Sequence, residues 1–316
     1  MTDTMHALFV RQMRLESDDV MSLELEAPDG SALHAWEPGA HLEVDLGDRG
    51  VRHYSLCGPR NAADTYTVAV LRTDTVMGGS DFVHRSLRPG DTLRTSSPRN
   101  HFSLDVARRY VLVAGGIGIT PIMAMISELE ATGADWTLHY GGKRRGSMAF
   151  VEALRAHGDR VTITSDDLEG PIDLDRALPP ADEQDVLVYC CGPTGLIDAV
   201  EQRCADRPEI VRVERFAPKV FEDEPADHAS FDVECAVSEV TVSVPDGTSI
   251  VDALEASGIG VDTSCRDGIC GTCETKVLAG VPLHRDSVLS SAEQEANRTM
   301  MICVSRAISD RLVLDL

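Results

Sequence analysis

The pattern of hydrophobic and polar positions changes along the chain, and its first stretch, residues 1–103, alternates in short runs. Apolar and polar side chains take turns at 21–25, 41–46 and 66–71. Turn residues such as Pro28-Asp29-Gly30 and Pro89-Gly90-Asp91 separate these runs. Strict alternation between turns is typical of antiparallel strands with one buried face. The stretch is therefore predicted to be a small antiparallel β-barrel.

Residues 104–217 follow a different rhythm. An apolar run at 110–114 precedes a glycine-rich turn and a segment with apolar residues at helical spacing. Further strand-like runs lie at 137–140, 160–164 and 185–189, with helical segments between them. Repeated strand–helix–strand patterns predict a parallel sheet in an α/β domain.

The last third is predicted to be a separate module behind a linker. Residues 218–229 are acidic and contain few large apolar side chains, which is typical of a linker. In the module, 230–316, a strand pair is expected at 231–235 and 240–244. Ser249 and Ser290 each precede a segment with the pattern of a helix start.

Composition and charge narrow the possible classes of protein. A chain of 316 residues should hold two or three domains. The formal net charge of −23 argues against binding to nucleic acid or anionic membranes. No apolar run has membrane-spanning length and no signal-peptide pattern opens the sequence, so a cytoplasmic location is expected. Nine cysteines in a cytosolic chain point to metal binding rather than disulfides.

Four of these cysteines show the most specific pattern in the chain. Cys265, Cys270 and Cys273 have the spacing C-x4-C-x2-C, and Cys303 follows later. This spacing is that of a plant-type [2Fe–2S] cluster, which needs four thiolates. Glycines at 268 and 271 would let the loop turn tightly. The alternatives are a zinc site, which usually has two paired C-x2-4-C units, or buried structural cysteines.

A second group of residues, in the barrel, is suited to a flavin. Arg52, Tyr54 and Ser55 lie together in one strand-like run, where they would pair a phosphate, stack on a ring and hydrogen-bond a ring edge. Leu71 ends another run, and Gly78-Gly79-Ser80 precedes a helical segment whose amides would cradle a phosphate. The alternative for each piece is ordinary barrel surface.

Two glycine turns in the α/β domain predict a dinucleotide crevice. The first turn, after the apolar run at 110–114, contains Gly115, Gly116 and Gly118, followed by Thr120 and Pro121. The second turn, after the run at 185–189, contains Cys191, Gly192 and Pro193. Glycine turns at the carboxyl ends of neighbouring parallel strands bind pyrophosphate.

Acidic residues after the strand at 160–164 favour NADH over NADPH. Asp166 and Asp167 would repel a 2′-phosphate and accept a hydrogen bond from a free ribose hydroxyl. The basic run Lys143-Arg144-Arg145 is the counter-argument, since it offers charges for a phosphate; its alternative is an exposed basic loop.

The order of these motifs resembles that of the phthalate dioxygenase reductase family over essentially the whole chain. The resemblance rests on Arg52-x-Tyr54-Ser55, Gly78-Gly79-Ser80, the two glycine turns and the C-terminal cysteine loop. It implies three domains: a flavin barrel like that of ferredoxin–NADP reductase, a nicotinamide domain and a plant-type ferredoxin with a β-grasp fold. The implied cofactors are FMN, NADH and one [2Fe–2S] cluster.

The resemblance also implies roles for single residues. Arg52 and Ser80 would hold the FMN phosphate, Tyr54 would stack on the flavin and Ser55 would approach the nitrogen that accepts hydride. Thr120, Cys191 and Gly192 would line the nicotinamide pocket. Phe216 would cover the other flavin face.

The function implied is the reductase component of a multicomponent oxygenase, expected to be a monomer. Electrons would pass from NADH through FMN to the cluster and on to a Rieske-type oxygenase for ring hydroxylation or O-demethylation. A cytochrome P450 partner, or a non-enzymatic electron-carrier module, are the alternatives. Arg266 in the cysteine loop would favour the more negative reduced cluster, or else be a solvated loop residue.

Overall fold

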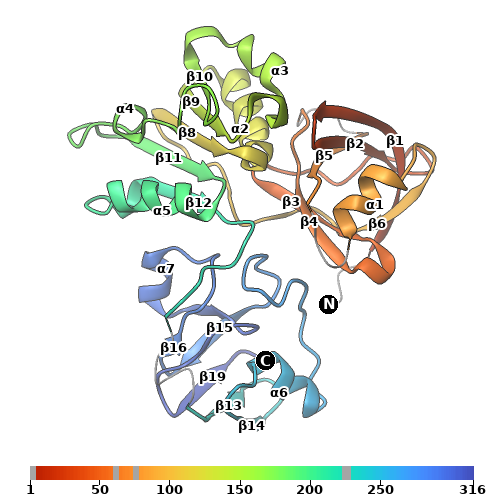
Figure 1. The fold of residues 1–316 in the computed structure, drawn as a ribbon. Coiled ribbons are helices and arrows are strands. Elements are labelled where there is room, and N and C mark those ends of the chain that lie inside the picture. Colours follow the sequence, from red (N-terminus) through yellow and green to blue (C-terminus); the bar gives the residue numbers. More distant parts are fainter. Residues whose placement is uncertain (1–4, 60–63, 74–77, 223–228) are drawn as a thin grey trace. The chain divides into compact units, whose positions relative to one another are not determined.

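The computed structural model describes residues 5–59, 64–73, 78–222 and 229–316 (Figure 1). The chain divides into two compact units, whose boundary in the sequence falls between Glu214 and Arg215. The unit before this boundary contains the predicted barrel and α/β domains. The unit after it contains the cysteine loop.

The first domain is an antiparallel barrel, as the alternating runs predict. Its strands follow the order β4-β3-β6-β1-β2-β5, with β7 paired to β3. A bridge from Leu56 to Val68 joins the end of β4 to β5 and closes the sheet on itself. The strands are β1 (His6–Ser17), β2 (Val20–Glu26), β3 (Ala40–Asp45), β4 (Val51–Ser55), β5 (Tyr66–Leu71), β6 (Thr92–Thr95) and β7 (Arg99–Asn100).

The barrel core explains the position of its helix. Alternate residues of the strands, including Leu23, Leu25 and Leu42, form an apolar cluster inside the barrel. Helix α1 (Gly79–Arg85) adds Val83 to this cluster. His84 of the same helix lies with Nε2 2.9 Å from the carbonyl oxygen of Val70 on β5. The last turn of α1 is thereby fixed beside the barrel strands. The 3-10 helix η1 (Gly47–Arg49) precedes β4.

The second domain is a five-stranded parallel sheet in the order β10-β9-β8-β11-β12. Its strands are β8 (Arg109–Gly115), β9 (Asp135–Gly142), β10 (Val161–Ser165), β11 (Val186–Cys191) and β12 (Val211–Glu214). Its helices are α2 (Ile119–Thr132), α3 (Val151–Arg155), α4 (Leu174–Ala177) and α5 (Thr194–Arg203), and its 3-10 helices are η2 (Gly116–Gly118), η3 (Arg145–Ser147), η4 (Gly158–Arg160) and η5 (Pro208–Ile210).

Helices cover both faces of this sheet, because alternate residues of the buried strands are apolar on both sides. Leu112 of β8 shares one apolar cluster with Met125 of α2. Val113, the next residue, belongs to a second cluster with Ile197 of α5. The near-continuous apolar run of β8 is what a strand covered on both faces requires.

The barrel packs against the α/β domain within the same unit. Val20 and Ala69 of the barrel belong to the apolar cluster that contains Tyr110 of β8. At the turn between β1 and β2, the backbone N–H of Asp18 donates to the carbonyl of Gly146 at 3.0 Å. The Ser17 hydroxyl donates to the carbonyl of Ser147 at 3.2 Å. This turn of the barrel therefore contacts the loop that follows β9.

The unit after the boundary has a mixed sheet in the order β14-β13-β19-β15-β17, in which β13 and β19 are parallel. Helix α6 packs its apolar residues on this sheet, which is the α+β arrangement predicted for the ferredoxin. The elements are β13 (Phe231–Cys235), β14 (Val240–Val244), α6 (Ile250–Ala256), β15 (Glu274–Ala279), β16 (Pro282–Leu283), α7 (Ser291–Ala296), β17 (Thr299–Met301), β18 (Arg306–Ala307) and β19 (Arg311–Leu314).

Both helices of this unit begin where the serines predict. Ser249 and Ser290 accept hydrogen bonds from the backbone three residues on, and Ser290 forms a complete capping box with Glu293. The predicted linker at 218–229 lies partly outside the described residues. At its start, Lys219 N–H donates to the hydroxyl of Ser287 at 2.9 Å. Among the described helices, none has the length and hydropathy needed to span a membrane.

Candidate functional site

The two glycine turns of the α/β domain touch each other. A Cβ atom on Gly118 would lie 2.2 Å from the carbonyl oxygen of Cys191, and one on Gly192 would lie 2.9 Å from the Cα of Gly115. A Cβ on Gly115 would meet the ring of Pro193 at 2.6 Å. Only glycine permits such close approach. The strands β8 and β11 are neighbours, so both turns lie at the same carboxyl edge of the sheet.

Each turn leads directly into a helix. Gly116 has φ +54° and opens η2, and α2 follows. The Thr120 hydroxyl donates to the carbonyl of Ile117 at 2.9 Å, which holds the first turn of α2. Pro193 caps the start of α5. Helix starts beside glycine turns expose backbone N–H groups to an anionic ligand. This geometry suits a pyrophosphate.

Cys191 pairs with a carboxyl group from the adjacent strand. Its thiol donates to Oε2 of Glu214 at 3.8 Å, because β11 and β12 align these two residues in register. Burial, followed by the nearby Glu214, raises the pKa of the Cys191 thiol well above its ordinary value. Burial also raises the pKa of the Glu214 carboxyl to about 8. The thiol and carboxyl therefore both favour their protonated forms near neutral pH.

In the barrel, Arg52 lies against the start of α1. A Cβ on Gly79 would fall 3.3 Å from the Nε atom of Arg52. Gly78 has φ +62°, a left-handed conformation that favours glycine. The guanidinium and the first amides of α1 thus lie together, as a phosphate ligand would require.

The other predicted flavin residues lie on β4, on β5 and at the start of α1. Burial raises the pKa of Tyr54 to about 12, and Ser55 is buried at the end of β4. The Ser80 hydroxyl donates to the carbonyl of Thr73 at 2.9 Å and accepts from its N–H at 3.0 Å. Leu71 packs against the apolar cluster shared with the α/β domain. Ser80 therefore also holds the segment after β5 against α1.

The carboxyl end of β10 carries the predicted ribose residue. Asp166 is exposed, and its backbone N–H donates to the carbonyl of Gly142 on β9 at 2.9 Å. Asp167 is exposed as well. Both carboxylates stand at the same edge of the sheet as the glycine turns, since all these strands are parallel.

The cysteine loop has the tight wrap that its glycines predict. Gly268 and Gly271 have φ +68° and +74°. A Cβ on Gly268 would lie 2.5 Å from Cγ2 of Val304, next to Cys303, and 3.2 Å from the Cα of Asp286. The loop thus packs directly on the segment that carries the fourth cysteine.

The four thiols form a single group. Hydrogen bonds with Cys270 and Cys303 lower the pKa of Cys265, and a hydrogen bond with Cys303 lowers the pKa of Cys273. The Asp267 N–H donates to the Cys265 sulfur at 3.3 Å. Among the described residues no three ligand side chains converge on one ion. The four grouped thiols would supply the ligands of a binuclear cluster, in which four thiolates hold two irons.

Arg266 links the cysteine loop to α6, and a buried carboxylate lies beside the loop. The guanidinium of Arg266 (φ +56°) donates to Asp252 at 2.8 Å and to Glu255 at 2.5 Å, both on α6. The carboxylate of Asp286 is fully buried and accepts the N–H groups of Val288 and Leu289. The positive charge of Arg266 is offset by the carboxylates of Asp252 and Glu255.

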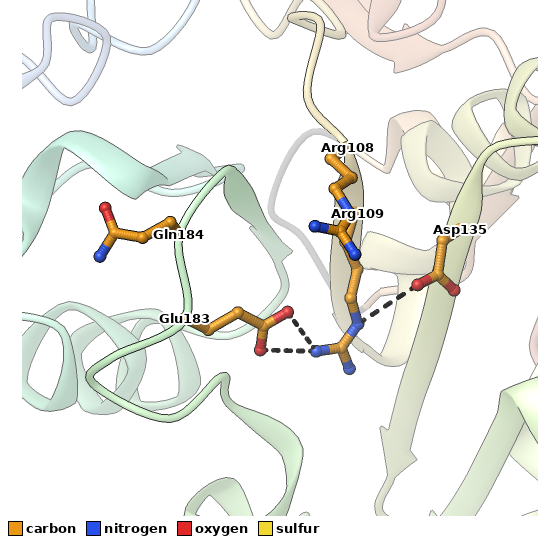
Figure 2. Close-up of a pocket in the computed structure, with 5 residues that line it drawn as sticks. All are labelled: Arg108, Arg109, Asp135, Glu183 and Gln184. Carbon is orange, nitrogen blue, oxygen red and sulfur yellow. Dashed lines mark hydrogen bonds and ion pairs between the residues drawn. The ribbon is translucent and has the colours of Figure 1, made fainter.

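A separate cavity of about 260 Å³ lies at the opposite, amino end of the parallel sheet (Figure 2). It is lined by Arg108, Arg109, Asp135, Glu183 and Gln184. The guanidinium of Arg109 donates to both carboxylate oxygens of Glu183, at 2.7 and 2.8 Å. Strand β8 begins here and ends at the first glycine turn, and β9 runs parallel to it, so this cavity is not part of the dinucleotide crevice.

The sequence alone does not identify Glu214, Thr73 or Glu169 as residues of the site. Glu214 is recognisable only after β12 is placed beside β11. Thr73 takes part through its backbone, which any residue carries. Phe216 is 39% exposed and belongs to the unit after the boundary, so its role against the flavin stays a prediction.

Comparisons with known proteins show what this chain is similar to. Residues 233–307 match the family model of the 2Fe-2S iron-sulfur cluster binding domain. The chain is 41% identical to the beta subunit of phenoxybenzoate dioxygenase from Ectopseudomonas oleovorans, over 98% of this chain and 97% of that protein. It is 39% identical to vanillate O-demethylase oxidoreductase from Pseudomonas sp. (strain HR199 / DSM 7063), over 98% of this chain and 99% of the relative.

Solved structures show the same architecture. The structure of phthalate dioxygenase reductase is 33% identical and matches with a TM-score of 0.69, over 99% of this chain and 98% of that one. An intact type IV self-sufficient cytochrome P450 monooxygenase is 40% identical and matches with a TM-score of 0.91, over 99% of this chain. The chain spans 41% of that longer P450 protein.

Fold, cysteine loop and comparisons together define an oxidoreductase of the class that couples a flavin and a nicotinamide to an iron–sulfur domain. Within this class, the chain belongs to the phthalate dioxygenase reductase family. The cofactors of this family are FMN, NADH and a [2Fe–2S] cluster, as the resemblance implied. The predicted fold class, with an antiparallel barrel, a parallel α/β sheet and an α+β ferredoxin fold, is confirmed.

Proposed function

We propose that this chain passes electrons from NADH through FMN to its [2Fe–2S] cluster and on to a separate Rieske-type oxygenase. The observation that carries the proposal is the identity of 41% and 39% to two relatives named as a dioxygenase subunit and an O-demethylase oxidoreductase, each over nearly the whole chain. When bound, FMN supplies the chemistry that links two-electron hydride transfer from NADH to one-electron transfer to the cluster.

The residues of this chain orient the cofactors. Arg52 and the first amides of α1 would bind the FMN phosphate, while Tyr54 and Ser55 would contact the ring. The turns at Gly115–Gly118 and Cys191–Pro193 would hold the pyrophosphate and the nicotinamide. Cys265, Cys270, Cys273 and Cys303 would bind the cluster.

The Cys191–Glu214 pair would shape the nicotinamide end of the crevice. Both groups are buried and both favour their protonated forms near neutral pH. A protonated pair adds no negative charge where a hydride leaves and the nicotinamide becomes cationic, so its contribution is positioning rather than charge stabilisation.

A cytochrome P450 partner is the second candidate, because a self-sufficient P450 monooxygenase matches this chain with a TM-score of 0.91. The test supplies the reduced protein to two purified acceptors. These are the oxygenase component of vanillate O-demethylase and the separate haem domain of the self-sufficient P450.

The proposal expects NADH to bleach the flavin and the Rieske oxygenase to accept electrons faster than the haem domain does. Faster transfer to the haem domain would favour the second candidate. Failure of NADH to bleach the flavin would overturn both and leave an electron carrier.

A further inference from the structure

The basic run Lys143-Arg144-Arg145 follows β9 directly, and two of its charges are already engaged. Arg144 lies 3.5 Å from Asp19, at the β1–β2 turn of the barrel. Asp19 also pairs with Arg72 at 2.9 Å. Arg145 pairs with Glu169 at 2.9 Å. Lys143 and Arg144 are exposed, as the alternative of an exposed basic loop expects, whereas Arg145 is partly buried beside Glu169.

Glu169 holds Arg145 with one oxygen and the end of β10 with the other. Its Oε1 accepts from Nη2 of Arg145, whose guanidinium also donates to the carbonyl of Ile163 at 3.3 Å. Its Oε2 accepts the N–H and the hydroxyl of Ser165 at 2.8 and 3.0 Å. These donors lower the pKa of Glu169, led by the Ser165 N–H, so the carboxylate is ionised at neutral pH.

The Arg145–Glu169 ion pair lies where the 2′-phosphate of NADPH would be expected. Ser165 pairs in register with Gly142, so Arg145 and Asp166 both emerge at the carboxyl edge of the sheet, beside the predicted ribose position. In dinucleotide crevices an acidic residue binds the ribose 2′-hydroxyl, whereas a nearby arginine accommodates a 2′-phosphate. Arg145 is one of the side chains with the charge for that task, and it already pairs with Glu169.

We propose that Glu169 is a specificity-determining residue, which keeps the enzyme selective for NADH by holding Arg145 on the end of β10. The inference rests on the proposed dinucleotide crevice. Asp166 and Asp167 repel the 2′-phosphate. Glu169 pairs with Arg145, so this arginine is not available to attract the phosphate. Selectivity thus comes from an added repulsion and a removed attraction together.

The main test replaces Glu169 by glutamine. In Glu169→Gln the side-chain carbonyl can still accept from Ser165, while the ionic hold on Arg145 is lost. The readouts are the Kd of 2′,5′-ADP by calorimetry, and kcat/KM for NADPH and NADH. We expect tighter 2′,5′-ADP binding and a higher kcat/KM for NADPH, each by about threefold to tenfold, because a charge-assisted phosphate contact becomes available. The value for NADH should change by less than about twofold, because the ribose contact with Asp166 is retained.

Two further variants make the result specific. The gain should disappear in the double variant Glu169→Gln/Arg145→Gln, since Arg145 is its source. In Glu152→Gln, which removes an exposed i,i+3 pair with Arg155 on α3, neither nucleotide should be affected. A gain that survives without Arg145, or equal gains for NADPH and NADH, would overturn the proposal.

A test that leaves Glu169 intact covers the case in which the glutamine variant does not fold. Asp166→Ser removes one repelling charge and should by itself improve 2′,5′-ADP binding modestly. Adding Arg145→Gln should leave that improvement unchanged, because Glu169 still holds the arginine. If the improvement is lost, Arg145 already reaches the phosphate, and Glu169 does not keep it away.

The wild-type protein separates this inference from the function on which it rests. Bleaching of the flavin by NADH supports the crevice. If NADH bleaches the flavin and the Glu169 variant shows no shift, only the specificity proposal fails.

Discussion

The carboxyl group of Glu214 makes the free energy of unfolding depend on pH. Burial raises its pKa from 4.5 to about 8, so the folded chain keeps a proton that the unfolded chain releases. The folded state binds more protons between these two values, and the free energy of unfolding therefore falls as pH rises from about 4.5 to 8. Below this window the carboxyl contributes no pH dependence.

We predict that Glu214→Gln removes most of this slope. Thermal unfolding of the first unit, followed by near-UV circular dichroism, should show a melting temperature that depends less on pH in the variant than in the wild type. Cys204→Ala, at a buried thiol elsewhere in the domain, is the control and should keep the wild-type slope. An unchanged slope in Glu214→Gln would assign the pH dependence to other groups.

Gly268 is a residue at which the cysteine loop has little space. We predict that Gly268→Ala lowers both iron content and the stability of the ferredoxin unit. The left-handed φ of +68° costs an alanine about 1–2 kcal/mol. The Cβ contact of 2.5 Å with Val304 should add roughly 1–3 kcal/mol as overpacking.

The matched control is Gly258→Ala. Gly258 has φ +80°, but a Cβ atom added there would meet no other atom within 4 Å, so this variant isolates the backbone cost. Iron per chain and the thermal midpoint of the cluster absorbance measure both variants. Equal losses in the two would show that the contact with Val304 is unimportant.

At the scale of elements, Arg266 links the cluster loop to α6. Its charge faces Asp252 and Glu255, so its influence on a nearby cluster is largely cancelled. We predict that Arg266→Gln shifts the reduction potential negatively by only tens of millivolts, because a solvent-screened unit charge contributes less than about 1 kcal/mol.

Redox titration followed by electron paramagnetic resonance measures this shift. In Asp252→Asn/Glu255→Gln the positive charge of Arg266 is no longer offset, and the potential should move in the opposite direction. A shift of the same sign in both variants would mean that loop geometry, rather than charge, sets the change.

Local patterns made most elements and the cluster site predictable. The cysteine spacing lies within nine residues, and the strands and helices at 66–71, 110–114 and 249–256 are encoded by periodicity and caps. The pairs Cys191–Glu214 and Arg145–Glu169 were not predicted, because each depends on which strands become neighbours and in which register. The sequence assigns the hydroxyl of Ser80 to the phosphate, which stays a prediction. Its hydrogen bond to the carbonyl of Thr73, seven residues earlier, could not be predicted, because it depends on the path of the chain after β5.

At the scale of the whole molecule, the division into two units predicts separable electron-transfer steps. Cys270→Ser should abolish most of the cluster signal, because four thiolates hold the two irons. Reduction of the flavin by NADH should keep its wild-type rate within about twofold, because the predicted nicotinamide and flavin residues other than Phe216 lie in the other unit.

Stopped-flow absorbance separates the two signals. Cys235→Ala, at a buried cysteine of the same unit that lies outside the C-x4-C-x2-C motif, is the control and should retain the cluster. Loss of flavin reduction in Cys270→Ser would contradict the separation of the units.

The net charge of −23 belongs to the molecule as a whole. Asp262, Asp267 and Glu274 are exposed near the cluster loop. We predict that electron transfer to the oxygenase slows severalfold between low and high salt, because screening weakens steering of a basic partner surface. Flavin reduction by NADH, measured in the same buffers, should change less. Transfer that does not depend on salt would remove this role for the acidic residues.

The contact between the β1–β2 turn and the loop after β9 has a consequence for protein engineering. Asp18 and Asp19 belong to the barrel, yet they hold Gly146 and Arg144 of the nicotinamide domain. A chimera that takes its barrel from a relative would place a foreign turn against this loop. Such grafts should therefore exchange residues 17–19 and 144–147 as one block, even though more than a hundred positions of sequence separate them.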